Sequence, residues 1–280
     1  MDSEIEQPKL AFDHFDLQKP LADAIRKIGF EYCTPIQAQS LVHTLQGHDV
    51  TGKAQTGTGK TAAFLITIIN DLISNPIEEE RYIAEPRALI VAPTRELAQQ
   101  IASDAQLLTD GCDMHVVTMV GGEDYAKQNR ALDARPVDIV VATPGRLLDF
   151  VQNGNLHLGA VEVLVLDEAD RMLDRGHYAE LNKIVLQITR SRVEEQVSDD
   201  DIDGGDGAEE SGGSGKSGKY GKSGGRNNKN TASASSSSSK RKKKGGRQEF
   251  KRQTMLFSAT MMLDADGRTN AKLKKGKRSR

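Results

Sequence analysis

The chain has 280 residues and a formal net charge of −2, so its overall charge neither favours nor excludes nucleic acid, membranes or acidic substrates. Its two cysteines, Cys33 and Cys112, stand far apart, and its six histidines show no ligand spacing. These counts argue against a disulfide scaffold and a Cys/His metal site, and they favour a reducing compartment.

Residues 1–11 are predicted to form an amino-terminal extension. Met1–Leu10 is acidic and has neither the basic start nor the apolar core of a secretory signal. The longest apolar stretches, Ala62–Ile69 and Ala88–Ala92, are far shorter than the roughly 20 residues that cross a bilayer. We therefore expect a cytoplasmic protein without a membrane partner.

Residues 12–190 alternate short apolar runs with helical stretches, which predicts an α/β domain with a parallel sheet covered by helices on both faces. One helix is expected at Pro35–Gln46, because Thr34 suits its N-cap, Pro35 its first turn and Gly47 its exit. Several runs are apolar throughout, as in strands that are buried on both faces. The predicted strands are Asp49–Gly52, Arg87–Ala92, His115–Val120, Val137–Ala142 and Val161–Leu166.

A phosphate-binding loop is predicted between the first strand and a helix that runs through Phe64–Leu72. Gly57 and Gly59 let backbone N–H groups face phosphate oxygens, Lys60 can neutralise the outer phosphates, and the Thr61 hydroxyl can ligate magnesium. The helix N-terminus adds its positive dipole end. Ala54 replaces the first glycine of the generic pattern, and a glycine-rich turn without ligand is the weaker alternative. The loop residues predicted to bind ATP are Ala54, Gln55, Thr56, Gly57, Thr58, Gly59, Lys60 and Thr61.

An acidic motif, Asp167-Glu168-Ala169-Asp170, follows the fifth predicted strand. It is expected at the carboxyl edge of the sheet, where ligands of open α/β sheets gather. Asp167 would hold magnesium, partly through water, and Glu168 would orient or activate the attacking water. A solvated acidic turn is the alternative, which the nearby phosphate loop makes weaker.

The pattern of a packed domain stops after Arg190. Residues 191–252 are first acidic, then rich in Gly, Ser and Lys, and they bury too little apolar surface to order, so a disordered low-complexity insertion is predicted. Its run Lys240–Lys244 could attract RNA through counterion release or serve as a solubilising linker, with equal weight. Order is expected to resume at 253–263 with a strand at Gln253–Phe257, followed by a basic tail at 264–280.

Together, these motifs resemble the DEAD-box RNA helicases, whose fold is a RecA-like phosphate-loop lobe. Each short motif is weak alone, but all occur in the order of that family. The resemblance covers about Phe12–Arg190 and Gln253–Thr260, and its details are similar to bacterial helicases associated with RNA degradation. Besides the phosphate loop and the acidic motif, it rests on Gly29-Phe30, Thr34–Gln37, Pro93–Ala98, Gly121-Gly122, Thr143–Arg146 and Ser258–Thr260.

The resemblance implies ATP and Mg²⁺ as cofactors, RNA as a partner bound without reading its sequence, and RNA-decay or ribonucleoprotein partners. Gln37 would read the adenine edge, Phe30 would lie against the adenine ring and Phe12 would support it. Lys60, Asp167 and Glu168 would be catalytic, and Thr61 and Asp167 would hold the metal. The RNA-contacting residues would be Thr94, Arg95, Gly122, Thr143, Gly145 and Arg146, and those coupling the two sites would be Asp170, Ser258 and Thr260.

The chain departs from the family pattern in two ways. The long segment between Asp170 and Ser258 replaces a compact connection, which a sheet can tolerate because closure entropy grows slowly with length. Nothing after Met261 resembles the arginine motif of a second lobe, and an arginine of that kind is worth about 10³ to 10⁵ in rate. We therefore predict an ATP-dependent RNA helicase represented by its first lobe. The alternative is a truncated, catalytically weak ATP- and RNA-binding module; a nucleotide kinase is disfavoured, because Gln37 and Thr143–Arg146 would lack a role.

Overall fold

The computed structural model describes residues 10–55, 57–77, 81–174, 176–188 and 252–260. The predicted extension before Leu10, nearly all of the insertion at 191–252, residues 261–263 and the basic tail lie outside the described residues. So does Thr56 of the phosphate loop. In the part that is described, no helix is long and apolar enough to cross a membrane.

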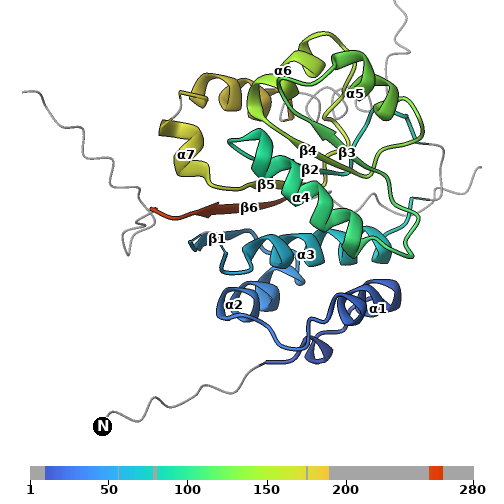
Figure 1. Ribbon diagram of the computed structural model, residues 1–280, viewed down its shortest axis with the longest axis vertical. Helices are drawn as coiled ribbons and strands as arrows, with labels where there is room; N and C mark the ends of the chain where they lie inside the picture. The colour runs from blue at the N-terminus through green and yellow to red at the C-terminus, as the bar shows by residue number, and fades with distance from the viewer. Residues whose placement is uncertain (1–9, 56, 78–80, 175, 189–251, 261–280) are drawn as a thin grey trace, which may run out of the picture.

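Among the described residues, six parallel strands form one sheet in the order β1-β6-β5-β2-β4-β3 (Figure 1). All six predicted strands are confirmed, and each boundary agrees to within two residues. β6 comes last among the described elements but lies between β1 and β5. The strands are β1 (Val50–Lys53), β2 (Ala88–Val91), β3 (Val116–Met119), β4 (Ile139–Ala142), β5 (Val163–Leu166) and β6 (Gln253–Ser258).

The helices follow the strands as the alternating pattern predicted. The helix expected at Pro35–Gln46 ends at Thr44, and Gly47 with a φ of 76° continues the turn that leaves it. The helices are η1 (Phe12–His14), α1 (Lys19–Ile28), α2 (Pro35–Thr44), α3 (Lys60–Ser74), α4 (Arg95–Leu108), α5 (Tyr125–Leu132), α6 (Pro144–Gln152), α7 (Ala169–Asp174) and a further helix at residues 178–188.

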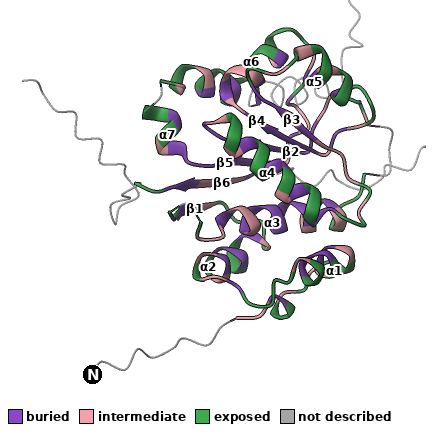
Figure 2. Cartoon of the chain, in the orientation of Figure 1, coloured by how far each residue is buried: buried purple, intermediate pink, exposed green. Residues whose placement is uncertain are grey.

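Two apolar cores cover the two faces of the sheet, and Figure 2 shows the central strands β2, β4 and β5 buried between them. β2 contributes to both, because successive side chains of a strand point to opposite faces: Ala88 and Ile90 join the core with α1 to α4, and Leu89 and Val91 join the core with α5 to α7. All four residues of β2 are fully buried. This double burial explains why the runs are apolar throughout rather than alternating.

Candidate functional site

The phosphate loop lies between β1 and α3, as predicted. Gly57 and Gly59 have φ values of 84° and 90°, a left-handed conformation that glycine adopts without strain. The Thr58 hydroxyl donates to the Gln55 carbonyl at 2.8 Å, which closes the turn. Lys60 and Thr61 then form the first turn of α3, so the backbone N–H groups of the helix start face the loop.

The ammonium of Lys60 lies opposite the acidic motif at the end of β5. Its Nζ is 3.1 Å from Asp167 Oδ1 and 4.0 Å from Glu168 Oε1, and all three side chains are at least 94% buried. Burial raises the pKa of Asp167 above its ordinary value, against the attraction of Lys60 and with a smaller contribution from the Glu168 charge. Glu168 has a φ of 50°, a strained conformation for a residue with a side chain. One buried cation therefore faces two buried carboxylates.

The acidic motif fits a partly hydrated magnesium ion. The Oδ2 atom of Asp167 is buried without a hydrogen-bond partner, and Oδ1 accepts from the Glu168 backbone N–H at 2.9 Å. Within the described ranges, no three His, Cys, Asp or Glu side chains are placed to hold a metal by themselves. Magnesium keeps several waters and takes one or two carboxylates plus phosphate oxygens, so the unpartnered Oδ2 of Asp167 suits it.

Gln37 is buried and joins α2 to the phosphate loop. Its Oε1 accepts from the Thr34 backbone N–H at 2.8 Å, a capping interaction at the start of α2, and its Nε2 donates to the Gly59 carbonyl at 3.0 Å. A Cβ on Gly59 would lie 2.6 Å from that Nε2. The amide keeps one N–H and one lone pair, so it can still meet the edge of a base.

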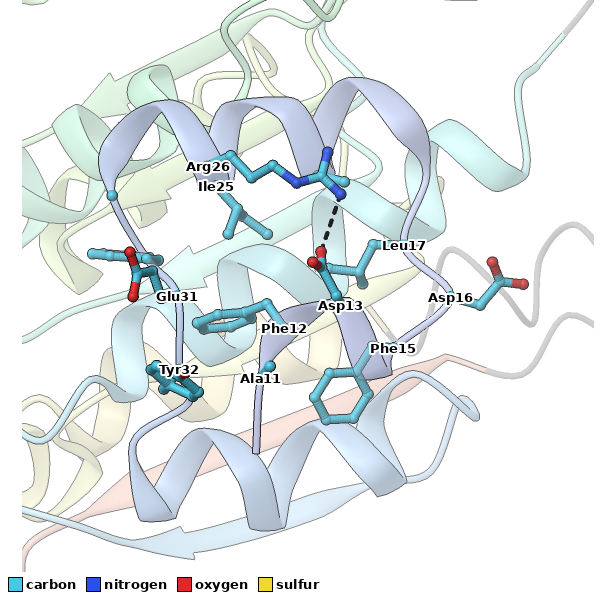
Figure 3. A pocket seen from close by; sticks show the side chains of 13 residues that line it. Ala11, Phe12, Asp13, Phe15, Asp16, Leu17, Ile25, Arg26, Glu31 and Tyr32 are labelled. Atoms are coloured by element: carbon cyan, nitrogen blue, oxygen red, sulfur yellow. Dashed lines mark hydrogen bonds and ion pairs between the residues drawn. The ribbon is translucent and has the colours of Figure 1, made fainter. Parts of the chain in front are cut away.

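Phe12 and Phe30 lie together beside a hollow of about 560 Å³ between η1, α1 and residues 29–32 (Figure 3). Their rings stack with centroids 6.2 Å apart, and Phe30 is 38% exposed while Phe12 is buried. Arg26 and Asp13, whose ion pair of 3.0 Å is drawn in Figure 3, close one side. Phe30 also borders a second hollow of about 700 Å³ next to Thr34 and Pro35. Gln37 lines neither hollow, so the structure groups the two rings with each other and Gln37 with the phosphate loop.

The residues expected to contact RNA gather at the carboxyl ends of β2, β3 and β4. Thr94 and Thr143 occupy the N-caps of α4 and α6, and the Thr94 hydroxyl accepts from the Leu97 N–H at 3.2 Å. Gly122 has a φ of 76°, and Arg95 Nη1 lies 3.3 Å from the place a Cβ would take there. Arg146 follows Gly145 in the first turn of α6.

The two arginines of this cluster already have partners. Arg95 Nη2 lies 3.1 Å from Glu123 Oε1, and both Nη atoms of Arg146 donate to the Glu123 carbonyl at 3.2 Å. The Arg146 guanidinium also lies over the Tyr125 ring at 5.5 Å, and its side chain is only 13% exposed. Sequence reasoning missed Glu123; an acidic residue directly after two glycines at a predicted phosphate-facing loop was the available signal.

Ser258 and Thr260 connect the end of β6 to the acidic motif. The Thr260 hydroxyl donates to Asp170 Oδ2 at 2.8 Å, and the Thr260 N–H donates to Ser258 Oγ at 3.3 Å. Although burial opposes it, hydrogen bonds from the Thr260 and Ser258 hydroxyls hold the pKa of Asp170 below its ordinary value. The Ser258 carbonyl accepts from the Ala54 N–H at 3.0 Å, so the same strand end also contacts the phosphate loop.

Cys33 and Cys112, whose spacing argued against a disulfide scaffold, are both free thiols. Burial raises the pKa of the Cys33 thiol to about 11, so it stays protonated at neutral pH.

Comparisons with known proteins agree with this arrangement. Residues 34–200 match the family model of the DEAD/DEAH box helicases. The chain is 58% identical over 184 residues to the ATP-dependent RNA helicase RhlB of Pseudomonas putida, covering 66% of this chain and 46% of that protein. It is 49% identical over 174 residues to RhlB of Shewanella sediminis, covering 62% of this chain and 40% of that protein. The chain thus spans less than half the length of these relatives.

Solved structures give the same family. A DEAD box protein from Methanococcus jannaschii aligns with a TM-score of 0.61 and 27% identity, over 90% of this chain and 51% of that one. The RNA helicase Prp28 from Chaetomium thermophilum, bound to ADP, aligns with a TM-score of 0.58 and 31% identity, over 88% of this chain and 44% of that one. Its phosphate loop faces an acidic pair at the carboxyl edge of a parallel sheet, and the chain belongs to the DEAD/DEAH box helicase family.

Proposed function

We propose that this chain is the ATP- and RNA-binding first lobe of an ATP-dependent RNA helicase, which couples RNA-stimulated ATP hydrolysis to separation of RNA strands. One observation carries the proposal: the buried Lys60 ammonium of the phosphate loop lies 3.1 Å from Asp167 of the acidic motif. A lysine and a metal-holding carboxylate at this spacing are what phosphoryl transfer requires of a protein that mainly positions charges.

In the proposed site, Lys60 and the N–H groups of the loop hold the triphosphate, and Asp167 and Thr61 hold magnesium, partly through water. Bound magnesium would neutralise charge on the phosphates. Glu168 orients or activates the attacking water; its carboxylate lies 4.0 Å from Lys60 Nζ and 3.1 Å from Arg171 Nη1, and these two cations hold it at the site. The Gln37 amide reads the adenine edge, and Phe30, supported by Phe12, packs against the ring.

On the RNA side, the N-termini of α4 and α6 supply Thr94, Thr143 and Gly145, and Arg95 and Arg146 supply positive charge. Gly122, with a φ of 76°, brings the loop after β3 close to Arg95, whose Nη1 would lie 3.3 Å from a Cβ at this position. Such contacts hold the sugar-phosphate backbone, so binding should depend little on base sequence. The hydrogen bond from Thr260 to Asp170 supports a role for Ser258 and Thr260 in linking the RNA face to the ATP site.

Titration with a fluorescent ATP analogue, with and without Mg²⁺, tests the nucleotide site. Lys60→Ala should abolish magnesium-dependent binding, because the phosphates lose their buried cation. Lys183→Ala, which removes an exposed lysine from the helix at 178–188, should bind like the unchanged chain. A Lys60→Ala variant that is folded and binds ATP·Mg²⁺ normally would refute the proposed site.

Adenine selectivity is tested separately with Gln37→Glu. The variant keeps an oxygen that can accept from the Thr34 N–H, and it loses the donor that the amide offers to Gly59 and to a base. We expect the preference for ATP over GTP to fall about tenfold or more, the size of a lost directional hydrogen bond in a buried site. An unchanged ATP-to-GTP ratio would remove Gln37 from the base site.

An RNA-stimulated ATPase assay separates the helicase from its alternative. Turnover that RNA stimulates and Lys60→Ala abolishes would assign catalysis to this chain. Binding of both ligands without turnover would instead support the ATP- and RNA-binding module. RNA-decay or ribonucleoprotein partners and a cytoplasmic location stay predictions, for which co-purification from cells and localisation of the tagged chain are the tests.

A further inference from the structure

Glu123 lies at the centre of the RNA-facing cluster and contacts it through two different groups. Its carboxylate oxygen Oε1 lies 3.1 Å from Arg95 Nη2 and accepts from Gln99 Nε2 at 2.6 Å. Its backbone carbonyl accepts from both Nη atoms of Arg146 at 3.2 Å. The residue therefore bridges α4, which carries Arg95 and Gln99, to the start of α6.

The place held by Oε1 has the chemistry of a phosphate site. Arg95 and Gln99 are four residues apart on α4, so they lie on the same face of the helix and point two donors at one oxygen. Guanidinium groups bind carboxylate and phosphate oxygens in the same geometry.

From this arrangement we propose that Glu123 is an internal competitor for RNA phosphate: its carboxylate occupies the donors of Arg95 and Gln99 and must leave before an RNA phosphate binds there. The inference rests on the proposed function, in which this face binds RNA. The Arg95 and Glu123 side chains are 43% and 30% exposed, so the pair is weak enough to exchange. The residue therefore lowers the affinity of this face for RNA.

The backbone contact keeps the loop in place when the carboxylate leaves. The Arg146 guanidinium is held by the Tyr125 ring at 5.5 Å and by the Glu123 carbonyl, and neither contact involves the Glu123 side chain. Gly122, with its φ of 76°, sets the backbone direction at the residue before Glu123. Glu123→Gln keeps this backbone and the shape of the side chain, so it removes the charge without removing the bridge.

The test is binding of a short fluorescein-labelled single-stranded RNA to the full chain over a series of salt concentrations. Glu123→Gln should bind about 1.5- to 5-fold more tightly, the range that corresponds to an exposed ion pair. The slope of log affinity against log salt should steepen by about 0.7, because one more net positive charge meets the RNA. Melting curves and ATP·Mg²⁺ titrations confirm that each variant is folded.

Glu96→Gln is the matched control, since it removes the same charge from the exposed residue next to Arg95. The decisive comparison is the double variant. In an Arg95→Ala background, Glu123→Gln should gain no more than Glu96→Gln does, because the Arg95 guanidinium that Glu123 occupies is gone and only the removal of one negative charge is left.

Equal RNA affinity for Glu123→Gln and Glu96→Gln, with normal binding by the unchanged chain, would overturn the competitor role alone. A full gain from Glu123→Gln in the Arg95→Ala background would overturn it as well. If neither the unchanged chain nor any variant binds RNA while all of them bind ATP·Mg²⁺, both this inference and the RNA part of the proposed function are overturned.

Discussion

Arg87 is expected to be a major determinant of stability, although it lies at the edge of the sheet opposite the nucleotide site. Its side chain is 5% exposed and makes two hydrogen bonds to the Glu162 carboxylate, at 2.7 and 2.8 Å. It also donates to the carbonyls of Asn75 at 2.7 Å and Leu72 at 3.3 Å, which are groups left unpaired at the end of α3.

The substitution Arg87→Met keeps much of the aliphatic volume and removes the charge. Loss of one partner of a buried ion pair costs about 3 to 5 kcal/mol. Glu162 is 16% exposed and can regain some water, so the loss from the ion pair should lie at the lower end of that range. Each of the two carbonyls that lose their donor adds about 0.5 to 1.5 kcal/mol to the loss of stability. We expect a loss of about 4 kcal/mol, a large part of the roughly 5 to 15 kcal/mol of a typical domain.

Urea unfolding followed by circular dichroism at pH 7 measures this loss. The double variant Arg87→Met/Glu162→Met should recover about 2 kcal/mol relative to the sum of the single losses, because no charge is then buried alone. ATP·Mg²⁺ affinity should stay within about twofold at temperatures where Arg87→Met is folded. A loss under about 1 kcal/mol, or additive single losses, would refute the reasoning.

The remaining predictions concern glycine positions and one half-buried acid. Gly52→Ala should cost about 1 to 3 kcal/mol in urea unfolding, because its Cβ would lie 2.7 Å from the Phe257 ring, and a change under 0.5 kcal/mol would contradict this. Gly59→Ala should weaken ATP·Mg²⁺ binding about tenfold or more, since its φ is 90° and its Cβ meets Gln37; unchanged binding would show that the loop relaxes. Burial, and then the Glu162 charge, raise the pKa of Asp71, so its ionisation costs stability as pH rises above 3.8. Asp71→Asn should therefore raise Tm at pH 7, with an advantage that shrinks as pH falls toward 4; a Tm difference independent of pH would refute this.

The sequence predicted the central strands well because their runs are apolar and buried on both faces, as at Ala88–Val91. The phosphate loop and the acidic motif were predictable because each is a short run of consecutive residues whose types and order suit phosphate or metal binding directly after a strand. The pair Arg87 and Glu162 was not, since its members are 75 residues apart and become neighbours only when β2 and β5 pair in register from Ala88 and Val163.

The same limit applies to contacts that depend on loop conformation. Gln37 was predicted to meet adenine, but its bond to the Gly59 carbonyl depends on the left-handed turn before α3. The acidic residue after Gly121 and Gly122 could be noticed in the sequence, but its ion pair with Arg95 is visible only in the fold. Local patterns therefore predicted the residue types of the site, and the tertiary arrangement decided which of them touch.

β6 lies between the two strands that carry the nucleotide site. At the carboxyl ends of the strands, a change in β6 therefore affects both nucleotide binding and stability, whereas a change at the amino ends can affect stability alone. β6 pairs Ser258 with Lys53 of β1 and Leu256 with Leu166 of β5, so it sets the gap between the phosphate loop and the acidic motif at about two strand spacings, roughly 9.6 Å. Its Phe257 ring covers Gly52 and packs on Phe64 of α3. Any change that shifts β6 must therefore alter the approach of Lys60 to Asp167 along with the packing, whereas Arg87 acts at the opposite ends of the strands and can change the packing alone.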